Sequence, residues 1–259
     1  FRYEWACSNQ QNAIHAETGW QSWPFTIKSG YRAYPRNFPE NYGSPYSARA
    51  DFRNERGIYH VIQTHLLKLE TEVLTDLFEY SEPEGLQTFA KHGTENRIKL
   101  KYPLTEKQQI IIKGTYRVSD ILHNQQMTRL NRKSISLSNI IKDGPYLKHS
   151  LSLHLINDQY RNESKSKHGI ALIQNSRYEG NVLRLSVTSG LYQTQSNIYL
   201  SQNSASDIGS YDILNDSGFL FSFESGIKYL KHYEVSALYS CQASEQYTHK
   251  AALNLAVRY

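Results

Sequence analysis

Apolar and polar residues alternate along most of this chain, and the alternation is most regular near the C-terminus. In residues 249–259 every second residue from Ala251 to Tyr259 is apolar, and the alternate positions include the polar residues Lys250, Asn254 and Arg258. A period of two places the apolar side chains on one face of a β-strand and the polar side chains on the other. This segment therefore predicts a strand with one apolar and one polar face.

The same period recurs from the first residue onward, so we expect an all-β fold with about 14 antiparallel strands. The segment 57–67 has no clear phase, because either Ile58 and Ile62 or Tyr59 and Val61 can form its apolar face. The expected strands cover residues 1–8, 13–21, 26–34, 57–67, 69–80, 97–104, 110–118, 134–142, 146–156, 168–178, 182–192, 218–230, 233–243 and 249–259.

Short and long connections alternate between these strands. Tight turns are expected at 22–25, 68, 105–107, 143–145, 179–181 and 231–232, and long loops at 35–56, 81–93, 119–133, 157–167 and 193–217. The last of these loops can carry a short extension of its hairpin at 197–201. Outer-membrane barrels typically have loops sorted in this way, an even number of strands and a final strand that ends on an aromatic residue. The alternative, a soluble β-sandwich, has no reason to sort its loops by length.

We therefore expect residues 1–259 to form a single domain, an antiparallel up-and-down transmembrane β-barrel of the bacterial outer membrane. Its apolar face would contact outer-membrane lipid, and its polar face would line the lumen. No basic and apolar export signal opens the sequence, so we expect the chain to start after such a signal or to be a fragment of a wider barrel.

Composition agrees with strands that are apolar on one side only. Apolar residues make up 39% of the chain and the mean hydropathy is −0.61, whereas aromatic residues reach 12% and include 20 tyrosines. No apolar run approaches the ~20 residues of a membrane-spanning helix, which excludes a helical membrane protein. The net charge of +5 comes from Lys and Arg spread over alternate strand positions, not from one basic stripe of the kind that binds nucleic acid.

Charged residues fall on the polar positions of the expected strands. The strands at 97–104 and 110–118 carry five cations on one face, and acids of the strand 69–80 would face them and form a lattice of ion pairs. These charges either act on passing solutes or only neutralise one another. The candidate lumen-lining residues are Arg32, Glu70, Glu72, Asp76, Lys99, Lys101, Lys113, Arg117, Arg184, Glu224 and Glu234.

Several short motifs follow one another in the first third of the chain: Trp5–Asn9, Gly19-Trp20, Tyr31–Tyr34, Phe38, Tyr42, Tyr46-Ser47, Asn54–Tyr59 and Asp76–Phe78. In this order they resemble the C-terminal barrel region of large bacterial outer-membrane proteins whose N-terminal part carries helix-hairpin-helix repeats related to competence DNA-binding proteins. The chain departs from that family in having no helix-hairpin-helix segment and in having Glu79–Pro83 where the family tends to carry Phe-Pro-Trp. The resemblance implies a barrel, with further strands upstream, and supplies no catalytic residues.

The function expected first is a channel or conduit for solutes or polymers. The second is a structural or assembly subunit of an envelope complex, linked to DNA uptake, and hence to nucleic acid, only through the family resemblance. Partner envelope proteins would dock on the long external loops. In the proline- and tyrosine-rich segment 35–56, residues that can narrow the lumen or bind a partner are Phe38, Tyr42, Tyr46, Arg49, Phe52 and Arg53.

Enzymatic activity is not expected, because the ten histidines are scattered and no metal- or phosphate-binding motif is present. His149 has no acid at a matching spacing, which a serine–histidine site would need. Asp207, Asp212 and Asp216 miss the spacing of a calcium-binding loop. We therefore expect no cofactor and no metal.

Overall fold

The computed structural model describes residues 2–8, 11–35, 54–80, 91–123, 126–201, 211–229, 233–243 and 247–257. Within them the chain is all-β, and the expected antiparallel up-and-down arrangement is confirmed: one 14-stranded sheet follows the order of the sequence. The strands are β1 Arg2–Ser8, β2 Gln11–Ser22, β3 Phe25–Tyr34, β4 Glu55–Leu66, β5 Leu69–Tyr80, β6 Lys91–Pro103, β7 Gln108–His123, β8 Gln126–Asp143, β9 Leu147–Tyr160, β10 Lys167–Glu179, β11 Leu183–Ser201, β12 Tyr211–Tyr229, β13 Tyr233–Ala243 and β14 Tyr247–Val257.

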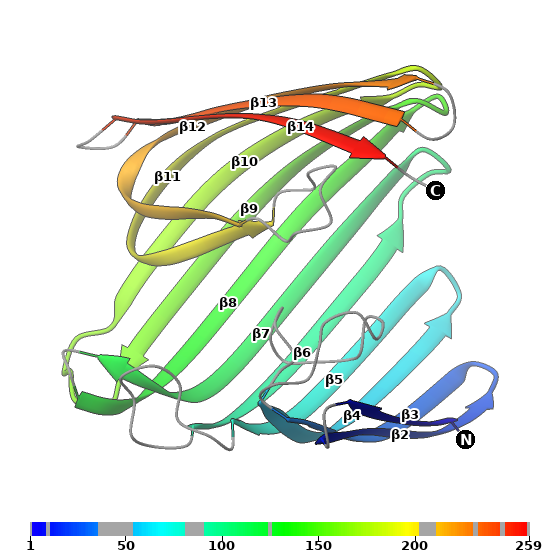
Figure 1. Ribbon diagram of the computed structural model, residues 1–259, viewed down its shortest axis with the longest axis vertical. Coiled ribbons are helices and arrows are strands. Elements are labelled where there is room, and N and C mark those ends of the chain that lie inside the picture. Colours follow the sequence, from blue (N-terminus) through cyan, green and yellow to red (C-terminus); the bar gives the residue numbers. More distant parts are fainter. Residues whose placement is uncertain are drawn as a thin grey trace. The chain divides into compact units, whose positions relative to one another are not determined.

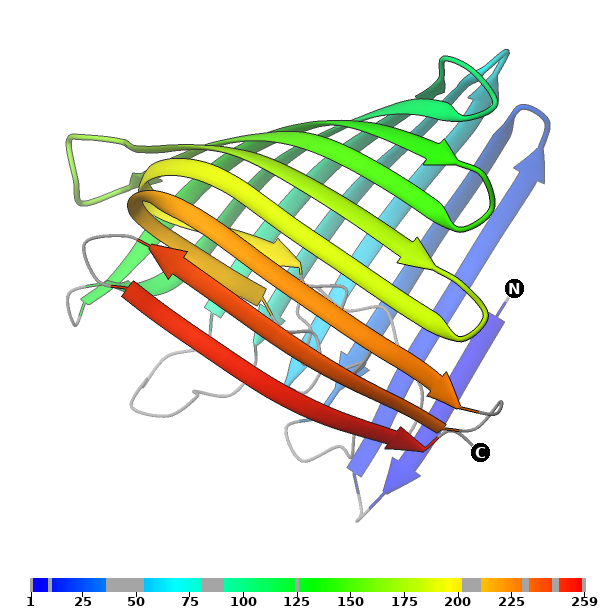
Figure 2. The same ribbon diagram turned by 90° about the horizontal axis from the view of Figure 1, so that it is seen from above.

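The strands group into two compact units, and each of the strands β6 to β9 is divided between them. The first comprises residues 1–101, 113–133 and 158–166, and the second comprises residues 102–112, 134–157 and 167–259. In the first unit β2 to β5 lie side by side and pair in an antiparallel register (Figure 1). In the second unit β10 to β14 pair in the same way, as Figure 2 shows for β10 to β12.

The structure settles the phase of β4, which the sequence left open. Ile58 and Ile62 are exposed, and Tyr59, which points to the other face, is only 2% exposed. Leu77 opposite Ile58 is also exposed, whereas Asp76 opposite Tyr59 is buried. The expected alternation of β5 is therefore confirmed, and Ile58 and Ile62 form the apolar side of β4.

The prediction of a long loop at 119–133 is wrong. β7 continues to His123 and β8 begins at Gln126, so both strands run through this segment. The backbone amide of Arg161 donates to the Arg129 carbonyl at 2.9 Å, which shows that backbone pairing continues here. Residues 119–133 lack regular apolar alternation, but backbone hydrogen bonds need no apolar side chains to form. The alternation of short and long connections therefore fails at this position.

The tight turn expected after β8 is confirmed. Gly144 has a φ of +69°, a conformation that glycine adopts without steric cost, and strand β9 starts at Leu147. Among the described residues, no helix is long and apolar enough to cross a membrane.

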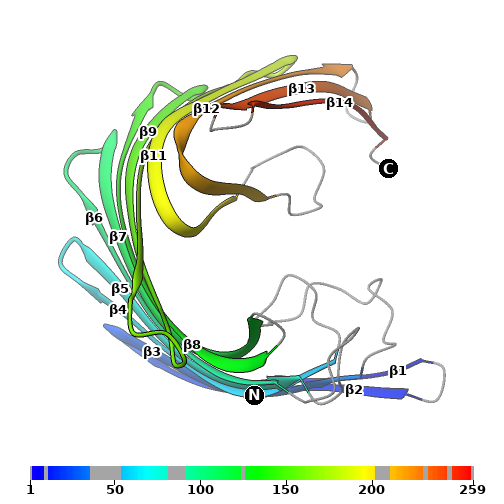
Figure 3. The same ribbon diagram turned by 90° about the vertical axis from the view of Figure 1, so that its left-hand side faces the viewer.

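β11 and β12 both continue into the long loop expected at 193–217, and the hairpin extension expected at 197–201 is confirmed. The ends of the two strands next to residues 202–210 form this extension, which is curled. Their pairing shifts register between Thr194 and Ile198, which marks a β-bulge or a similar irregularity. Beyond that point the two strands curl together away from β10 and β13 (Figures 1 and 3). Extra residues in one strand increase the local bend and twist, which accounts for the curl.

Candidate functional site

The described strands distribute apolar and charged residues in the opposite way to a soluble sheet. Large apolar side chains are exposed, among them Trp20, Leu77, Leu151 and Leu191, whereas Arg32, Asp76 and Asp158 are at most 1% exposed. We call the side that carries Arg32 and Asp76 in the first unit, and Arg184 and Glu224 in the second, the polar face. The other side of the strands is the apolar face. Because buried charges are stable only when paired, the polar face is where function should be sought.

Arg32 is the centre of a buried charge cluster that joins three consecutive strands. Its Nη1 and Nη2 atoms donate to the two Asp76 carboxylate oxygens at 2.8 and 2.9 Å, and its Nε donates to Glu55. Gly57, the partner of Arg32 in the register, leaves room for the guanidinium: a Cβ at this position would lie 3.0 Å from Arg32 Cζ and even closer to the Leu77 carbonyl oxygen. The bidentate pair fixes the guanidinium plane against β5.

Tyr59 forms a second buried centre on the same face. Its hydroxyl donates to Glu17 at 2.8 Å and lies 2.9 Å from His15 Nε2. The ring lies over Gly30, where an added Cβ would collide with it. A tyrosine on β4 thus bonds to two side chains of β2 across the glycine of β3. Alternation within one strand gives no information on such contacts, so the sequence did not predict this centre.

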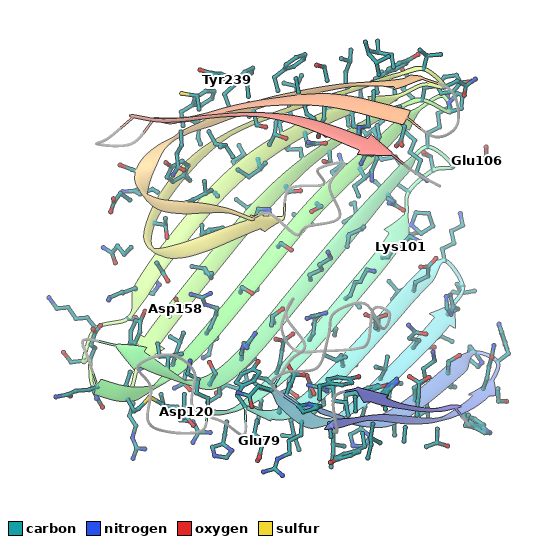
Figure 4. The ribbon with its side chains drawn as sticks, in the orientation of Figure 1. Glu79, Lys101, Glu106, Asp120, Asp158 and Tyr239 are labelled. Carbon is teal, nitrogen blue, oxygen red and sulfur yellow. The ribbon has the colours of Figure 1, made fainter. Side chains whose placement is uncertain are left out.

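The ion-pair lattice expected on β5 to β7 is partly formed. Lys101, labelled in Figure 4, bonds to both oxygens of Glu70 at 2.9 Å. Glu95 accepts from Arg97 at 2.5 Å and from Arg117 at 3.4 Å, and the Arg117 guanidinium lies 4.9 Å from the centre of the Phe78 ring. Glu95 is a member of this lattice that sequence reasoning missed.

Glu72, Lys99 and Lys113 lie on the same face of these strands. Glu72 is opposite Lys99 in the register and accepts from the Gln63 amide at 2.8 Å. Lys99, Arg97 and Glu72 are the electrostatic neighbours of Lys113. The structure therefore brings these candidates together, but with more cations than carboxylates.

In the second unit Arg184 donates to Glu224 at 2.7 Å, and both side chains are buried. The third candidate of this unit, Glu234, pairs with Lys228 in the register. Another buried carboxylate, which the sequence did not single out, is Asp158 of the first unit. It accepts two hydrogen bonds from Arg132, at 2.8 and 2.5 Å. The loop candidates Phe38, Tyr42, Tyr46, Arg49, Phe52 and Arg53 lie outside the described residues.

An apolar cluster on the polar face of the second unit is a feature that sequence reasoning missed. Ile198 and Leu214, from the curled extension of β11 and β12, are 3% and 0% exposed. They pack with residues of the polar face itself and with the partly buried Ile156; these residues are Ala171, Ile173, Tyr192 and Leu220. Two features of the sequence point toward this cluster: the hairpin extension expected at 197–201, and the apolar residue Leu220, which is out of phase with the apolar positions of its strand.

The aromatic residues next to the short turns are exposed on the apolar face. In the first unit they are Trp20, Trp23 and Phe25, around the turn between β2 and β3. In the second unit Tyr146 and Tyr178 are a ring pair with centroids 6.1 Å apart beside the turns that precede β9 and follow β10. Amphipathic rings in this position suit the boundary between water and an apolar phase.

Two serine–histidine pairs also lie on the apolar face. Ser29 Oγ is 2.8 Å from His60 Nδ1, and Ser176 Oγ is 2.9 Å from His149 Nδ1. A hydrolytic site also needs a third group that orients the histidine. Within the part of the chain that the structure describes, neither histidine is bonded to a carboxylate, and no cluster of His, Cys, Asp or Glu fits a metal ion.

The described strands form an antiparallel meander in which apolar side chains are exposed and charged side chains are buried. No protein-family model and no curated protein sequence matches the chain. Among solved structures it is similar to a NanC porin, with 6% identity, a TM-score of 0.40 and coverage of 80% of this chain and 94% of that chain. It is also similar to CdiB from Escherichia coli, with 9% identity, a TM-score of 0.47 and coverage of 95% of this chain. The chain spans 53% of CdiB.

Proposed function

We propose that the sheet closes into a transmembrane β-barrel of the bacterial outer membrane and that its polar face lines a conduit for solutes. The observation that carries the proposal is the inverted distribution of side chains over the described strands. Exposed Leu, Ile, Val and Trp residues cover one face, while Arg32, Asp76, Asp158 and Glu224 are buried on the other. Exposed apolar surface of this extent needs an apolar surrounding, which lipid provides.

A barrel of this width is wide enough to enclose a conduit for solutes. Barrels of eight strands are filled by their own side chains, and barrels of 16–18 strands leave an aqueous channel, so about 14 strands would enclose a lumen that side chains narrow. In the second unit the curled extension of β11 and β12 already covers part of the polar face. This extension and the segment 35–56 are the two elements that we propose as constrictions.

The test is the conductance of the refolded full chain in a planar lipid bilayer. Two variants accompany it: one in which residues 197–214 are replaced by a short turn, and one in which residues 36–55 are deleted. We expect stable single-channel steps that become larger when a constriction is removed. A heat-resistant, folded chain that conducts in none of the three forms would refute the conduit.

A structural or assembly subunit of an envelope complex is the second candidate. The apolar cluster of Ile198, Leu214 and their neighbours favours it, because apolar side chains on the polar face fill space that a solute would use. A silent barrel that captures a defined envelope protein through its long loops would support this function. The link to nucleic acid rests on the family resemblance alone and is tested by binding of DNA to the refolded chain.

A further inference from the structure

The polar face of β5 to β7 contains a row of charges that is out of balance. Glu72 lies opposite Lys99 in the register of β5 and β6. On the next strand pair, Glu95 is bonded to Arg117, and a Cβ on Gly114 would lie 3.1 Å from Ile98 Cγ2. The Gly114 contact indicates that Gly114 lies across from Ile98. In an antiparallel pair the adjacent position then places Lys113 across from Lys99, which is one of its charged neighbours, so the row consists of Glu72, Lys99 and Lys113.

Two like charges directly opposite one another destabilise a pair of strands. Among the residues that the structure describes, the nearby carboxylates compensate these charges only in part. Glu70 is bonded through both oxygens to Lys101, and Asp76 is bonded through both oxygens to Arg32. Glu95 is shared by Arg97 and Arg117. Glu72 is therefore the carboxylate that faces both lysines, and it also accepts a hydrogen bond from Gln63.

We propose that Lys99 and Lys113 form an anion-binding step on the wall of the conduit, which takes small solutes that carry carboxylate or phosphate groups. The inference rests on the proposed conduit, and it adds the class of solute. An oxyanion between the two ammonium groups supplies the negative charge that this row lacks. Lys113 is exposed and Lys99 is half-buried, so the pair is open to a passing solute while its position is fixed by the strands. Arg97, in the next row, adds a third cation.

The surrounding residues explain why the step is local. Nearer the long loops, charges pair closely, as in the cluster of Arg32, Glu55 and Asp76. Nearer the short turn, Lys101 is matched by Glu70. A solute that moves along this wall therefore meets an excess of positive charge in the rows of Lys99 and Arg97 and compensated charge on either side. A charged step of this kind raises the local concentration of the opposite ion.

The experiment measures the reversal potential of the refolded full chain in a bilayer of neutral lipid under a potassium chloride gradient. We expect the native chain to prefer chloride, with a permeability ratio of chloride to potassium above one that declines as salt screens the step. The double variant Lys99→Gln with Lys113→Gln should lower this ratio to one or below. Lys113→Arg, which keeps the charge, should retain the preference.

A matched control is Lys133→Gln, which removes the same charge from the opposite face of β8, since Lys133 is in phase with the exposed Ile135. It should leave the ratio unchanged. Inorganic phosphate and succinate, added separately as probes, should reduce the chloride current through the native chain and not through the double variant. The two probes distinguish phosphate-bearing from carboxylate-bearing solutes.

The experiment distinguishes failure of the anion-binding step from failure of the conduit. A chain that conducts without preference for chloride, or a double variant that keeps the preference, overturns the anion step and leaves the conduit intact. A folded chain that does not conduct refutes the conduit and the anion step together. The native measurement needs no variant, so a double variant that fails to fold does not prevent the test.

Discussion

Substitution of Arg32 by methionine tests whether the buried charge cluster is a structural centre of the first unit. Arg32 is 0% exposed, and its two carboxylate partners, Glu55 and Asp76, are each 1% exposed. Methionine has a similar length but no charge, so the substitution leaves two carboxylates next to one another with no cation. Breaking a buried ion pair by removal of one partner costs about 3–5 kcal/mol.

This magnitude corresponds to a loss of roughly a hundredfold to a few thousandfold in the ratio of folded to unfolded protein. The control is Lys101→Met, which breaks the pair with Glu70 on the same face. Those two side chains are 33% and 44% exposed, so the expected loss is only about 0–1 kcal/mol. A second variant adds Glu55→Gln and Asp76→Asn to Arg32→Met and removes all three charges. It should recover most of the stability, because no uncompensated charge is then buried.

The assay is urea unfolding of the refolded protein in lipid vesicles, followed by tryptophan fluorescence. The difference in free energy of unfolding between Arg32→Met and Lys101→Met is the quantity of interest. The reasoning is refuted if the two losses are equal. It is also refuted if the triple variant is no more stable than Arg32→Met alone, because the loss would then come from packing and not from charge.

Three further predictions use other parts of the structure. Gly30→Val should destabilise the fold by about 1–3 kcal/mol, because the new side chain collides with the Tyr59 ring, whereas Gly19→Ala, with its nearest contact at 3.5 Å, should have little effect in the same unfolding assay. Leu214→Ala should release the curled extension of β11 and β12 at a cost of about 2–5 kcal/mol, which would appear as faster proteolysis within residues 197–214 than in the Leu191→Ala control on the apolar face. Fluorescence of Trp20 and Trp23 should be quenched most strongly by lipids brominated near the headgroup; quenching only by a water-soluble agent would contradict a membrane boundary at this turn.

The period of two was enough to predict the all-β antiparallel fold and most strand positions. It works because successive side chains of a strand point to opposite faces, so the contrast between exposed Leu77 and buried Asp76 is present in the sequence. It left the phase of Ile58 and Tyr59 open, because both residues are apolar enough to form the apolar face of β4. It failed at residues 119–133, where β7 and β8 continue through backbone hydrogen bonds that do not depend on side-chain polarity. The turn chemistry of Asp143-Gly144 was sufficient at the other end of β8.

The polar candidates were found as a class, but their partners were not. Alternation placed Arg32 and Asp76 on one face, yet the bidentate bond between them depends on Gly57 of β4, which leaves space for the guanidinium. Glu95 was missed because the expected strand began after it, at residue 97. The cluster around Leu214 was missed for another reason: it depends on a change of register in β11 that no periodic pattern contains.

The Arg32 cluster also bears on how neighbouring strands find their correct alignment during assembly. A shift of β4 by one residue relative to β3 would turn Glu55 to the apolar face and replace Gly57 beneath the guanidinium with Arg56 or Ile58. A shift of β5 would remove Asp76 in the same way. Each shifted register leaves a buried charge without its partner. The three residues therefore favour one register of β3, β4 and β5 over registers shifted by one residue.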